Sequence, residues 1–309
     1  MNPIHQLTEG RKMFLTVMTI FIGYAVVFIV FDDFDRQRLR PIGSVDDLHL
    51  IIFSLVVMLI LTFVLHRYAA GMDQRINRDG AEKQAAMRRQ LTQNIAHELK
   101  TPVASIQGYL ETLSSHPDID REQREQFLQR SLAQAQRLAA LLRDITTLQR
   151  IDEAPGLHTF ENLDVAAIVE GIQRETALQL AENHITFDNQ LPQHIFLQGN
   201  ATLVYGIFRN LTDNAIAYAG NGATIIVSAE ESMHAWHFSF RDNGPGVASQ
   251  HLPRLFERFY RIDKGRSREL GGTGLGLAIV KNAVMLHGGT INAYNDHGLR
   301  FDFTLMKQR

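Results

Sequence analysis

The sequence predicts an α+β protein of several domains: two membrane-spanning helices, then a helical hairpin, then an α/β sandwich. Two long apolar runs lie near the N-terminus, apolar residues then recur at helical spacing around a proline, and strand and helix patterns fill the remainder. The chain has 309 residues, of which 45% are hydrophobic and 21% charged, and this balance excludes a disordered chain. The absence of cysteine excludes a disulfide scaffold and any cysteine-ligated metal site. A net charge of −2 gives no support to direct nucleic-acid binding.

The two apolar runs, residues 13–31 and 48–65, contain no Asp, Glu, Lys or Arg. At about 1.5 Å per residue, each is long enough as a helix to cross a hydrocarbon core of roughly 30 Å. The first run is too long for the apolar part of a signal peptide, and no small-residue cleavage site precedes Asp32. The second run is too uniformly apolar for an amphipathic core helix. We therefore expect a membrane anchor over residues 1–66.

Basic residues favour one orientation of this anchor. Arg11 and Lys12 precede the first run, and several basic residues follow the second, whereas the loop 32–47 carries five aspartates against three arginines. Basic residues collect on the cytoplasmic side, so both termini are expected inside and the loop outside. The lipid bilayer is therefore an expected partner.

Residues 67–90 form an expected helical connector, and residues 91–151 an expected helical hairpin. A break over residues 114–120, with Pro117, separates two apolar stripes. Their members are Leu91, Ile95, Leu99, Val103, Ile106, Leu110 and Leu113 in the first helix, and Phe127, Leu132, Ala135, Leu138, Leu142, Ile145 and Leu148 in the second. One hairpin has a small core, so we expect two copies to form a four-helix bundle, which makes the protein a homodimer.

His97 lies about 200° around the first helix from Ile95, so it is expected to face away from this stripe. A single surface histidine is commonly only a solvated side chain. Here Glu98 follows it, Thr101 lies one turn further, and Pro102 weakens the helix by removing a backbone donor. An exposed neutral imidazole beside a carboxylate is a competent nucleophile.

The segment AHELKTPVASIQGYLETL resembles the phosphoacceptor motif of bacterial sensor histidine kinases, of the His-Glu-x-x-Thr-Pro type. The resemblance implies that His97 is autophosphorylated on a ring nitrogen and that Glu98 is the general base. It also implies that Thr101 positions water when the protein removes phosphate from its partner, the receiver domain of a response regulator.

Beyond a linker at 151–158, residues 159–309 predict an α/β sandwich. Alternating β-branched and aromatic residues predict strands in ITFDNQL, ATIIVSAE, HAWHFSFRDN, TINAYND and RFDFTLM. Helices are expected over residues 164–182, 201–219 and 273–287.

Four motifs lie along this domain. Asn210 and Asn214 share one helix face, and their amide oxygens suit Mg²⁺. Asp242 ends a strand in DNGPGV, where Gly244 and Gly246 permit a tight turn. A carboxylate at this place is able to accept a hydrogen bond from an adenine amino group. Each motif taken singly is commonly an ordinary cap or turn.

The third motif is LFERFYRIDKGRSREL, in which Phe256 and Phe259 are expected to anchor one edge of a mobile segment. Its cations, among them Arg261 and Lys264, are able to meet phosphate oxygens. The fourth is GGTGLGLAIVK, whose glycines open a helix and turn backbone N–H groups toward phosphates. These glycines are Gly272, Gly274 and Gly276.

In this order the four motifs resemble the Bergerat-type ATP-binding domain of sensor histidine kinases. The resemblance implies ATP and Mg²⁺ as cofactors, with Asn214 as the main metal ligand and Asn210 assisting. It implies that Tyr218 stacks on adenine, that Asp242 selects it, and that residues 248–271 form a lid. Ala217 stands where the family usually has Lys or Arg.

Together the two resemblances imply a membrane sensor kinase that phosphorylates His97 from ATP and passes the phosphoryl group to an aspartate of a response regulator. Two alternatives remain open. One is a catalytically silent membrane scaffold that binds a regulator, although a scaffold needs none of the nucleotide motifs. The other is a Bergerat-type ATPase without histidine transfer, which the His97–Glu98 pair disfavours.

Overall fold

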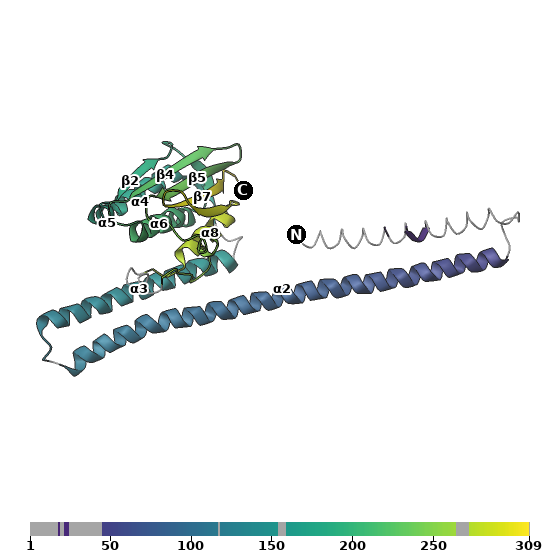
Figure 1. Cartoon of the computed structure of the whole chain (residues 1–309), viewed down its shortest axis with the longest axis horizontal. Helices are drawn as coiled ribbons and strands as arrows, with labels where there is room; N and C mark the ends of the chain where they lie inside the picture. Colours follow the sequence, from purple (N-terminus) through teal and green to yellow (C-terminus); the bar gives the residue numbers. More distant parts are fainter. Residues whose placement is uncertain are drawn as a thin grey trace. The chain divides into compact units, whose positions relative to one another are not determined.

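The structure is a computed structural model that describes residues 18, 22–24, 45–116, 118–153, 159–263 and 272–308. Its contacts divide the chain into two compact units, Met1–Gln90 and Leu91–Arg309. Helix α2 (Val45–Ser115) begins in the first unit and ends in the second. The α/β domain lies wholly within the second unit (Figure 1).

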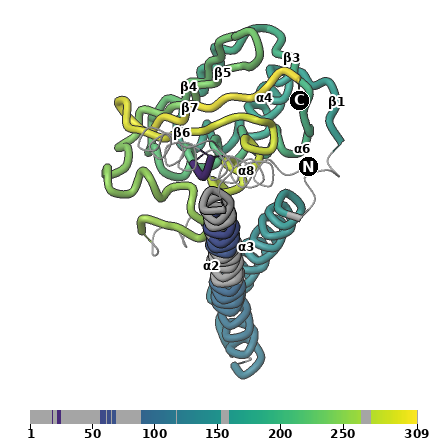
Figure 2. The backbone as a smooth tube through the Cα atoms, turned by 90° about the vertical axis from the view of Figure 1, so that its right-hand side faces the viewer, coloured from purple at the N-terminus to yellow at the C-terminus, as the bar shows by residue number. Residues whose placement is uncertain are grey.

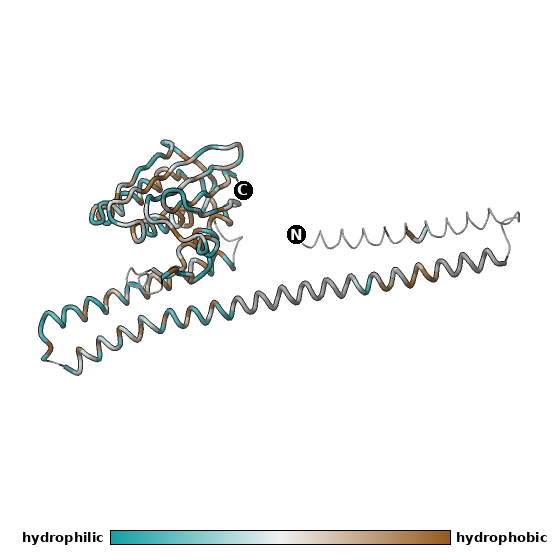
Figure 3. Tube along the Cα trace, in the orientation of Figure 1, coloured by the Kyte–Doolittle hydropathy of each residue, from teal (hydrophilic) through white to brown (hydrophobic). Residues whose placement is uncertain are grey.

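In the first unit, α2 contains the whole of the expected second span, residues 48–65, and the last three residues of the expected loop 32–47. Figure 3 shows described residues of this stretch as hydrophobic. Its described apolar side chains between Val56 and Val64 are largely exposed, with Leu59 at 68% and Phe63 at 66%. Apart from residues 18 and 22–24, the expected first span lies outside the described residues. A Cβ built on Gly23 would lie 3.0 Å from Sδ of Met58, so this part of the first run lies against α2. No described helix is long and apolar enough to cross a membrane.

In the second unit, α2 and α3 (Arg121–Glu153) form the expected helical hairpin. Figure 2 shows α3 beside α2. The predicted break is confirmed, because α2 ends at Ser115 and Asp120 caps the start of α3 by accepting from the Gln123 amide at 2.8 Å. The rings of Tyr109 and Phe127 stack across the hairpin with centroids 5.7 Å apart. Helix α3 runs to Glu153 and so occupies the first three residues of the expected linker 151–158.

The apolar stripes of the hairpin are only partly covered. Leu148 is 3% exposed, whereas Val103, Leu110 and Leu142 are each close to half exposed. Leu141, which is not a member of the predicted stripe, is also 3% exposed. Contacts with the α/β domain explain the burial of Leu141 and Leu148, whereas Val103 and Leu110 line a hollow on α2.

The α/β domain is built on a five-stranded sheet in the order β2-β4-β5-β7-β6. All neighbouring strands are antiparallel except the parallel pair β2–β4. The strands are β2 (Thr186–Gln190), β4 (Thr224–Glu231), β5 (Ala235–Asp242), β6 (Ile291–Asn295) and β7 (Leu299–Met306), which confirms the five predicted strands. Two further strands, β1 (Glu161–Asp164) and β3 (Phe196–Gly199), pair antiparallel and were not predicted. Four residues are too few to show a period-two pattern.

Helices pack on this sheet and bury the core. They are α4 (Val165–Glu175), α5 (Ala177–Glu182), α6 (Ala201–Tyr218) and α8 (Gly276–Leu286), and a short 3₁₀ turn, η1 (Leu252–Arg254), lies within the expected lid 248–271. The aromatic centre of the core is Phe208 of α6 against Phe238 and Phe303 of the sheet, with ring centroids 5.2–5.6 Å apart.

The expected single helix over 164–182 is wrong, since the structure has two helices, α4 and α5, joined at Thr176. The Thr176 hydroxyl donates to the Ile172 carbonyl at 2.8 Å, and such a bond competes with the helical backbone pattern. Asp164 caps the start of helix α4, and its carboxylate accepts from the Ala166 amide. Burial opposes ionisation of Asp164, but hydrogen bonds from His194 and the Ile195 amide outweigh it and lower its pKa.

Candidate nucleotide and phosphoacceptor site

His97 lies on the part of α2 that belongs to the second unit, and its side chain is exposed. The Thr101 hydroxyl donates to the His97 carbonyl at 3.3 Å, one turn back along the helix. Pro102 follows within the helix, is buried, and has no N–H to donate. The Thr101 hydroxyl therefore provides the His97–Pro102 turn with a local bond in addition to the helical pattern.

Glu98 points away from solvent and toward α3. Its Oε2 lies 3.1 Å from Nη2 of Arg137 on α3 and 3.9 Å from Nη1 of Arg261 in the α/β domain. All three side chains are shielded, with exposed fractions of 18% for Glu98, 9% for Arg137 and 6% for Arg261. The carboxylate expected to act as general base is therefore held by two guanidinium groups from different parts of the second unit.

The asparagine pair on α6 faces the start of α8. Asn210 donates its side-chain amide to the Gly206 carbonyl at 2.7 Å, which fixes the orientation of the amide group. A Cβ built on Gly276 would lie 2.5 Å from Oδ1 of Asn210, so only glycine allows this close approach. Asn214 lies one turn further along α6 and is partly buried. The structure thus brings the first and fourth sequence motifs together, with an amide oxygen beside a helix N-terminus.

Asp242 ends β5 and is 7% exposed. Burial raises its pKa, while hydrogen bonds from the Gly244 amide at 2.8 Å and the Leu299 amide at 3.3 Å act in the opposite direction. A Cβ on Gly244 would lie 2.6 Å from Cα of Ala219, so the turn after Asp242 lies against the C-terminal end of α6. Tyr218, the last residue of α6, is 39% exposed.

The turn continues to Gly246, which has φ of 68°. Asn295 on β6 holds this turn, because its Oδ1 accepts from the Val247 amide at 2.9 Å and its Nδ2 donates to the Val247 carbonyl at 2.6 Å. A Cβ on Gly246 would lie 2.7 Å from Oδ1 of Asn295. Asn295 was not predicted as a site residue, since its contribution depends on pairing between distant segments.

The two phenylalanines of the third motif have different surroundings. Phe256 packs on the sheet, with its ring centroid 6.2 Å from that of Phe301. Phe259 has φ of 63°, an uncommon value for a bulky side chain, and donates its amide to the Gly274 carbonyl at 2.8 Å. Phe259 thereby connects the expected lid to the glycine motif.

The expected phosphate-binding cations are only partly described. Arg261 lies against Glu98, and a Cβ on Gly274 would be 3.2 Å from its Nε. In this arrangement the guanidinium group contacts the hairpin, next to the glycine motif. Lys264 and the rest of the expected lid up to residue 271 lie outside the described residues.

The glycine motif precedes α8 directly. Gly272 is partly buried, Gly274 has φ of 74°, and α8 begins at Gly276, three residues later than the predicted helix 273–287. The Leu275 amide donates to the Thr273 hydroxyl at 3.2 Å, and that hydroxyl donates to Asp144 of α3 at 2.6 Å. These two bonds hold the segment that starts α8 against the hairpin.

Helices α3 and α8 form an apolar contact between the hairpin and the α/β domain. Its buried members are Leu141 and Leu148 of α3 with Leu275 and Ile279 at the start of α8, and Leu99, Ile145 and Phe259 pack against them. Polar contacts flank it, since Arg258 donates to both carboxylate oxygens of Asp152 at 2.9 and 2.8 Å. We call this set the docking interface.

Burial in the docking interface raises the pKa of Asp144, and the hydrogen bond from Thr273 reduces this effect. Asp144, Arg137 and Thr273 were not predicted as site residues. Each is an ordinary polar residue in the sequence, and only the contact between hairpin and α/β domain brings it to the site.

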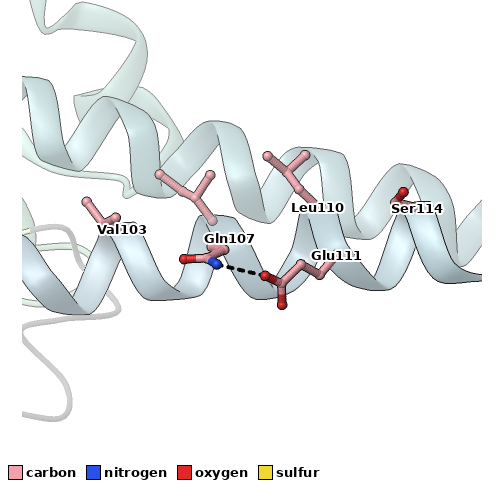
Figure 4. Close-up of a pocket in the computed structure, with 6 residues that line it drawn as sticks. Val103, Gln107, Leu110, Glu111 and Ser114 are labelled. Atoms are coloured by element: carbon pink, nitrogen blue, oxygen red, sulfur yellow. Dashed lines mark hydrogen bonds between the residues drawn. The ribbon is translucent and has the colours of Figure 1, made fainter.

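A separate hollow of about 460 Å³ lies on one face of α2, lined by Val103, Ile106, Gln107, Leu110, Glu111 and Ser114. Figure 4 shows these side chains on one stretch of α2, with Gln107 donating to Glu111 at 2.7 Å. Its surface is almost wholly apolar except at this pair. The hollow coincides with the exposed part of the predicted hairpin stripe.

Two family profiles match the parts of the chain just described. Residues 87–154 match the His Kinase A (phospho-acceptor) domain, and residues 199–309 match the histidine kinase-, DNA gyrase B- and HSP90-like ATPase. The chain belongs to the two-component sensor histidine kinases.

Relatives of this family cover the same region. The sensor-like histidine kinase SenX3 of Mycobacterium tuberculosis H37Rv is 37% identical over 229 residues, which are 74% of this chain and 55% of SenX3. The phosphate regulon sensor protein PhoR of Haemophilus influenzae is 34% identical over 224 residues, which are 72% of this chain and 52% of PhoR. The chain thus spans about half the length of the curated relatives it matches.

Solved structures of histidine kinases share the fold of this chain. The Acinetobacter baumannii histidine kinase AdeS has a TM-score of 0.56 at 25% identity and covers 68% of this chain and 98% of that one. Histidine kinase ThkA, solved in complex with response regulator protein TrrA, has a TM-score of 0.57 at 19% identity and covers 71% of this chain and 61% of that one. The helical hairpin and the α/β ATPase domain are therefore both family features.

Proposed function

We propose that this sensor histidine kinase phosphorylates itself on His97 from ATP and passes the phosphoryl group to an aspartate of a response regulator. The observation that carries the proposal is the juxtaposition of two motifs within the second unit. The turn of α2 that holds His97 and Glu98 meets the α/β domain at Arg261, next to the glycine motif. An exposed histidine and a carboxylate thus lie close to the glycine motif that is expected to bind phosphates.

The described residues fit ATP·Mg²⁺. Asn210 lies against the N-terminus of α8, where backbone N–H groups favour phosphate oxygens. Asn214 and Asn210 would supply amide oxygens to a Mg²⁺ that bridges to those phosphates. Asp242, buried at the end of β5, would accept from the adenine amino group, while Gly244 and Gly246 keep the adjoining turn compact.

Around the nucleotide, Tyr218 would stack on the adenine from the end of α6. Phe256 and Phe259 would hold the near edge of the lid, and Gly272 and Gly274 would give the segment before α8 its tight path. Arg261 and Lys264 would contact phosphate oxygens when ATP is bound. Such a nucleotide site acts by positioning and by neutralising charge, which are the main requirements of phosphoryl transfer.

In the transfer step, a ring nitrogen of His97 attacks the γ-phosphorus, and the bond from that phosphorus to the leaving ADP oxygen breaks. Glu98 takes the ring proton. The phosphohistidine then donates its phosphoryl group to a carboxylate of the regulator's receiver domain. Thr101, one turn along the same helix, would position water when the kinase dephosphorylates that partner.

One labelling experiment tests the kinase. The purified full chain is incubated with γ-labelled ATP and magnesium, and the product is treated with acid and with base. Phosphohistidine gives label that acid removes and base does not, and His97→Gln is expected to remove it. A wild-type chain without label supports the silent scaffold, whereas ATP hydrolysis without label supports an ATPase that lacks histidine transfer.

Two variants separate the proposed roles within the α2 turn. Glu98→Ala is expected to bind ATP normally and label slowly, because this variant lacks the proton acceptor. Thr101→Ala is expected to keep autophosphorylation and to lose dephosphorylation of the phosphorylated regulator. Normal dephosphorylation by Thr101→Ala would refute the role given to its hydroxyl.

The kinase is proposed to act as a homodimer. The apolar hollow on α2 and the half-exposed Val103, Leu110 and Leu142 support a second hairpin packing there to complete a four-helix bundle. Leu110→Glu is expected to shift the protein toward monomer in sedimentation, and an unchanged dimer would contradict this face.

We also propose that residues 13–31 and 48–65 anchor the kinase in the bacterial inner membrane, with both termini in the cytoplasm. Exposed Leu59 and Phe63 on α2 support an apolar environment for the second run. The expressed chain should remain in the membrane fraction after a carbonate wash, and recovery in the wash would contradict the anchor.

A further inference from the structure

Arg137 connects the two helices of the hairpin at Glu98. The two residues are 39 positions apart in the sequence, yet Nη2 of Arg137 lies 3.1 Å from Oε2 of Glu98. Both side chains are largely shielded from water, at 9% and 18% exposure. Exposed ion pairs contribute little to stability because water screens them. In a shielded pair, the charge-assisted hydrogen bond is stronger and constrains the orientation of both side chains.

The Glu98 carboxylate has two cationic neighbours of different kinds. Arg137 belongs to the hairpin itself, so its contact does not depend on the α/β domain. Arg261 belongs to the α/β domain and lies further away, at 3.9 Å from the same oxygen. Arg137 is therefore the neighbour that can hold Glu98 throughout a reaction cycle in which the α/β domain moves.

The chemistry of the adjacent histidine gives this contact a consequence. His97 and Glu98 are consecutive on α2, so their side chains leave the helix about 100° apart. A glutamate with three rotatable bonds reaches a neighbouring ring nitrogen only in some of its conformations. An arginine that binds one carboxylate oxygen from the opposite helix limits those conformations.

We propose that Arg137 is a positioning residue, which orients the Glu98 carboxylate for removal of the ring proton of His97. This inference rests on the proposed function. In this role Arg137 acts through Glu98, whose carboxylate it binds.

The test measures initial rates of autophosphorylation of the full chain with γ-labelled ATP over a range of ATP concentrations. Arg137→Ala is expected to lower kcat about 10-fold to 100-fold, a part of the 10²-fold to 10⁴-fold that a general base supplies, with KM for ATP unchanged within about twofold. Arg137→Lys keeps the positive charge and is expected to recover part of kcat. The matched control is Arg130→Ala, an exposed arginine on the same helix, which should label like the wild type.

A double variant separates positioning from a general structural role. In the Glu98→Gln background, Arg137→Ala should cause no further loss, because the group it positions is no longer a base. An equal loss in both backgrounds, a wild-type kcat in Arg137→Ala, or no recovery in Arg137→Lys would each overturn the inference. If Arg137→Ala fails to fold by circular dichroism, Arg137→Lys and its double variant with Glu98→Gln provide the same comparison.

The failure of this inference is distinguishable from failure of the proposed function. A wild-type chain without acid-labile label overturns the kinase function and the role of Arg137 with it. Normal wild-type labelling together with an unaffected Arg137→Ala overturns the role of Arg137 alone.

Discussion

Leu148→Ala is predicted to release the α/β domain from the hairpin. Leu148 is 3% exposed and packs in the docking interface with Leu275 and Ile279. Replacing a buried leucine by alanine costs about 3 kcal/mol, from lost transfer free energy and the cavity that remains. At about 1.4 kcal/mol for each factor of ten, the ratio of docked to undocked molecules should fall about 100-fold.

The matched control is Leu142→Ala, on the same helix and 49% exposed. It removes the same atoms from a position outside the docking interface, so its effect on docking should stay below about 0.5 kcal/mol. Circular dichroism of both variants checks that α3 remains helical.

Docking is measured as a distance between spin labels on the hairpin and on the α/β domain. The chain contains no cysteine, so Gln129→Cys on α3 and Ala181→Cys on α5, both at exposed positions, provide unique attachment sites. The labelled chain is mixed with an excess of unlabelled chain, so that a dimer carries one labelled copy. The wild type should then give one narrow distance distribution and Leu148→Ala a broad one. The reasoning is refuted if Leu148→Ala keeps the narrow distribution while its helix content is unchanged.

Three further predictions concern single side chains. Asp164→Ala removes the cap of α4 and should lower the free energy of unfolding, measured in urea, by about 1–2 kcal/mol. The pKa of Asp164 is lower in the folded than in the unfolded state, so its stabilising contribution is present above the unfolded pKa and disappears as pH falls through the folded pKa. If Asp164→Ala lowered the free energy of unfolding equally at pH 7 and pH 2, this prediction would be wrong. The pKa of Asp144 is raised in the folded state, so docking of the α/β domain should weaken as pH rises through this folded pKa. Asp144→Asn still accepts the hydrogen bond from Thr273 but does not ionise, so in this variant the distance between the labels should no longer depend on pH. Gly276→Ala should weaken binding of a fluorescent ATP analogue about 10-fold or more, because the added Cβ would meet Asn210. The control Gly206→Ala, where a Cβ meets nothing within 4 Å, should bind normally, and equal affinities of the two variants would refute the expected contact between Asn210 and the start of α8.

The local elements were largely predictable because their signals lie within short windows. Alternating residues in β4, β5 and β7 reproduce the observed strands, and the break before Arg121 follows from turn-forming residues. Strands β1 and β3 escaped prediction because each has four residues and exists through pairing with the other. The periodicity of apolar residues also did not predict that Leu141 is buried and Leu142 exposed, because contact with the α/β domain decides which face of α3 is covered.

The candidate site divides in the same way. His97, Asn214 and Asp242 were predictable as site residues because each belongs to a motif contained in a short segment of the sequence. Arg137, Asp144 and Asn295 escaped prediction because their partners lie 39 to 129 residues away in the sequence. For Arg261 the sequence predicted a phosphate contact, whereas the structure has its guanidinium group beside Glu98.

By itself, the sequence indicated the family of this protein, the two helices of the hairpin, the five strands of the main sheet, and the chemical groups available for phosphoryl transfer. These properties follow from residue identity and from local periodicity. Only the tertiary structure decided which of those groups meet. It brought Glu98 between Arg137 and Arg261, and the start of α8 against Asn210 and Asp144, because such contacts depend on how whole elements pack and not on their local sequence.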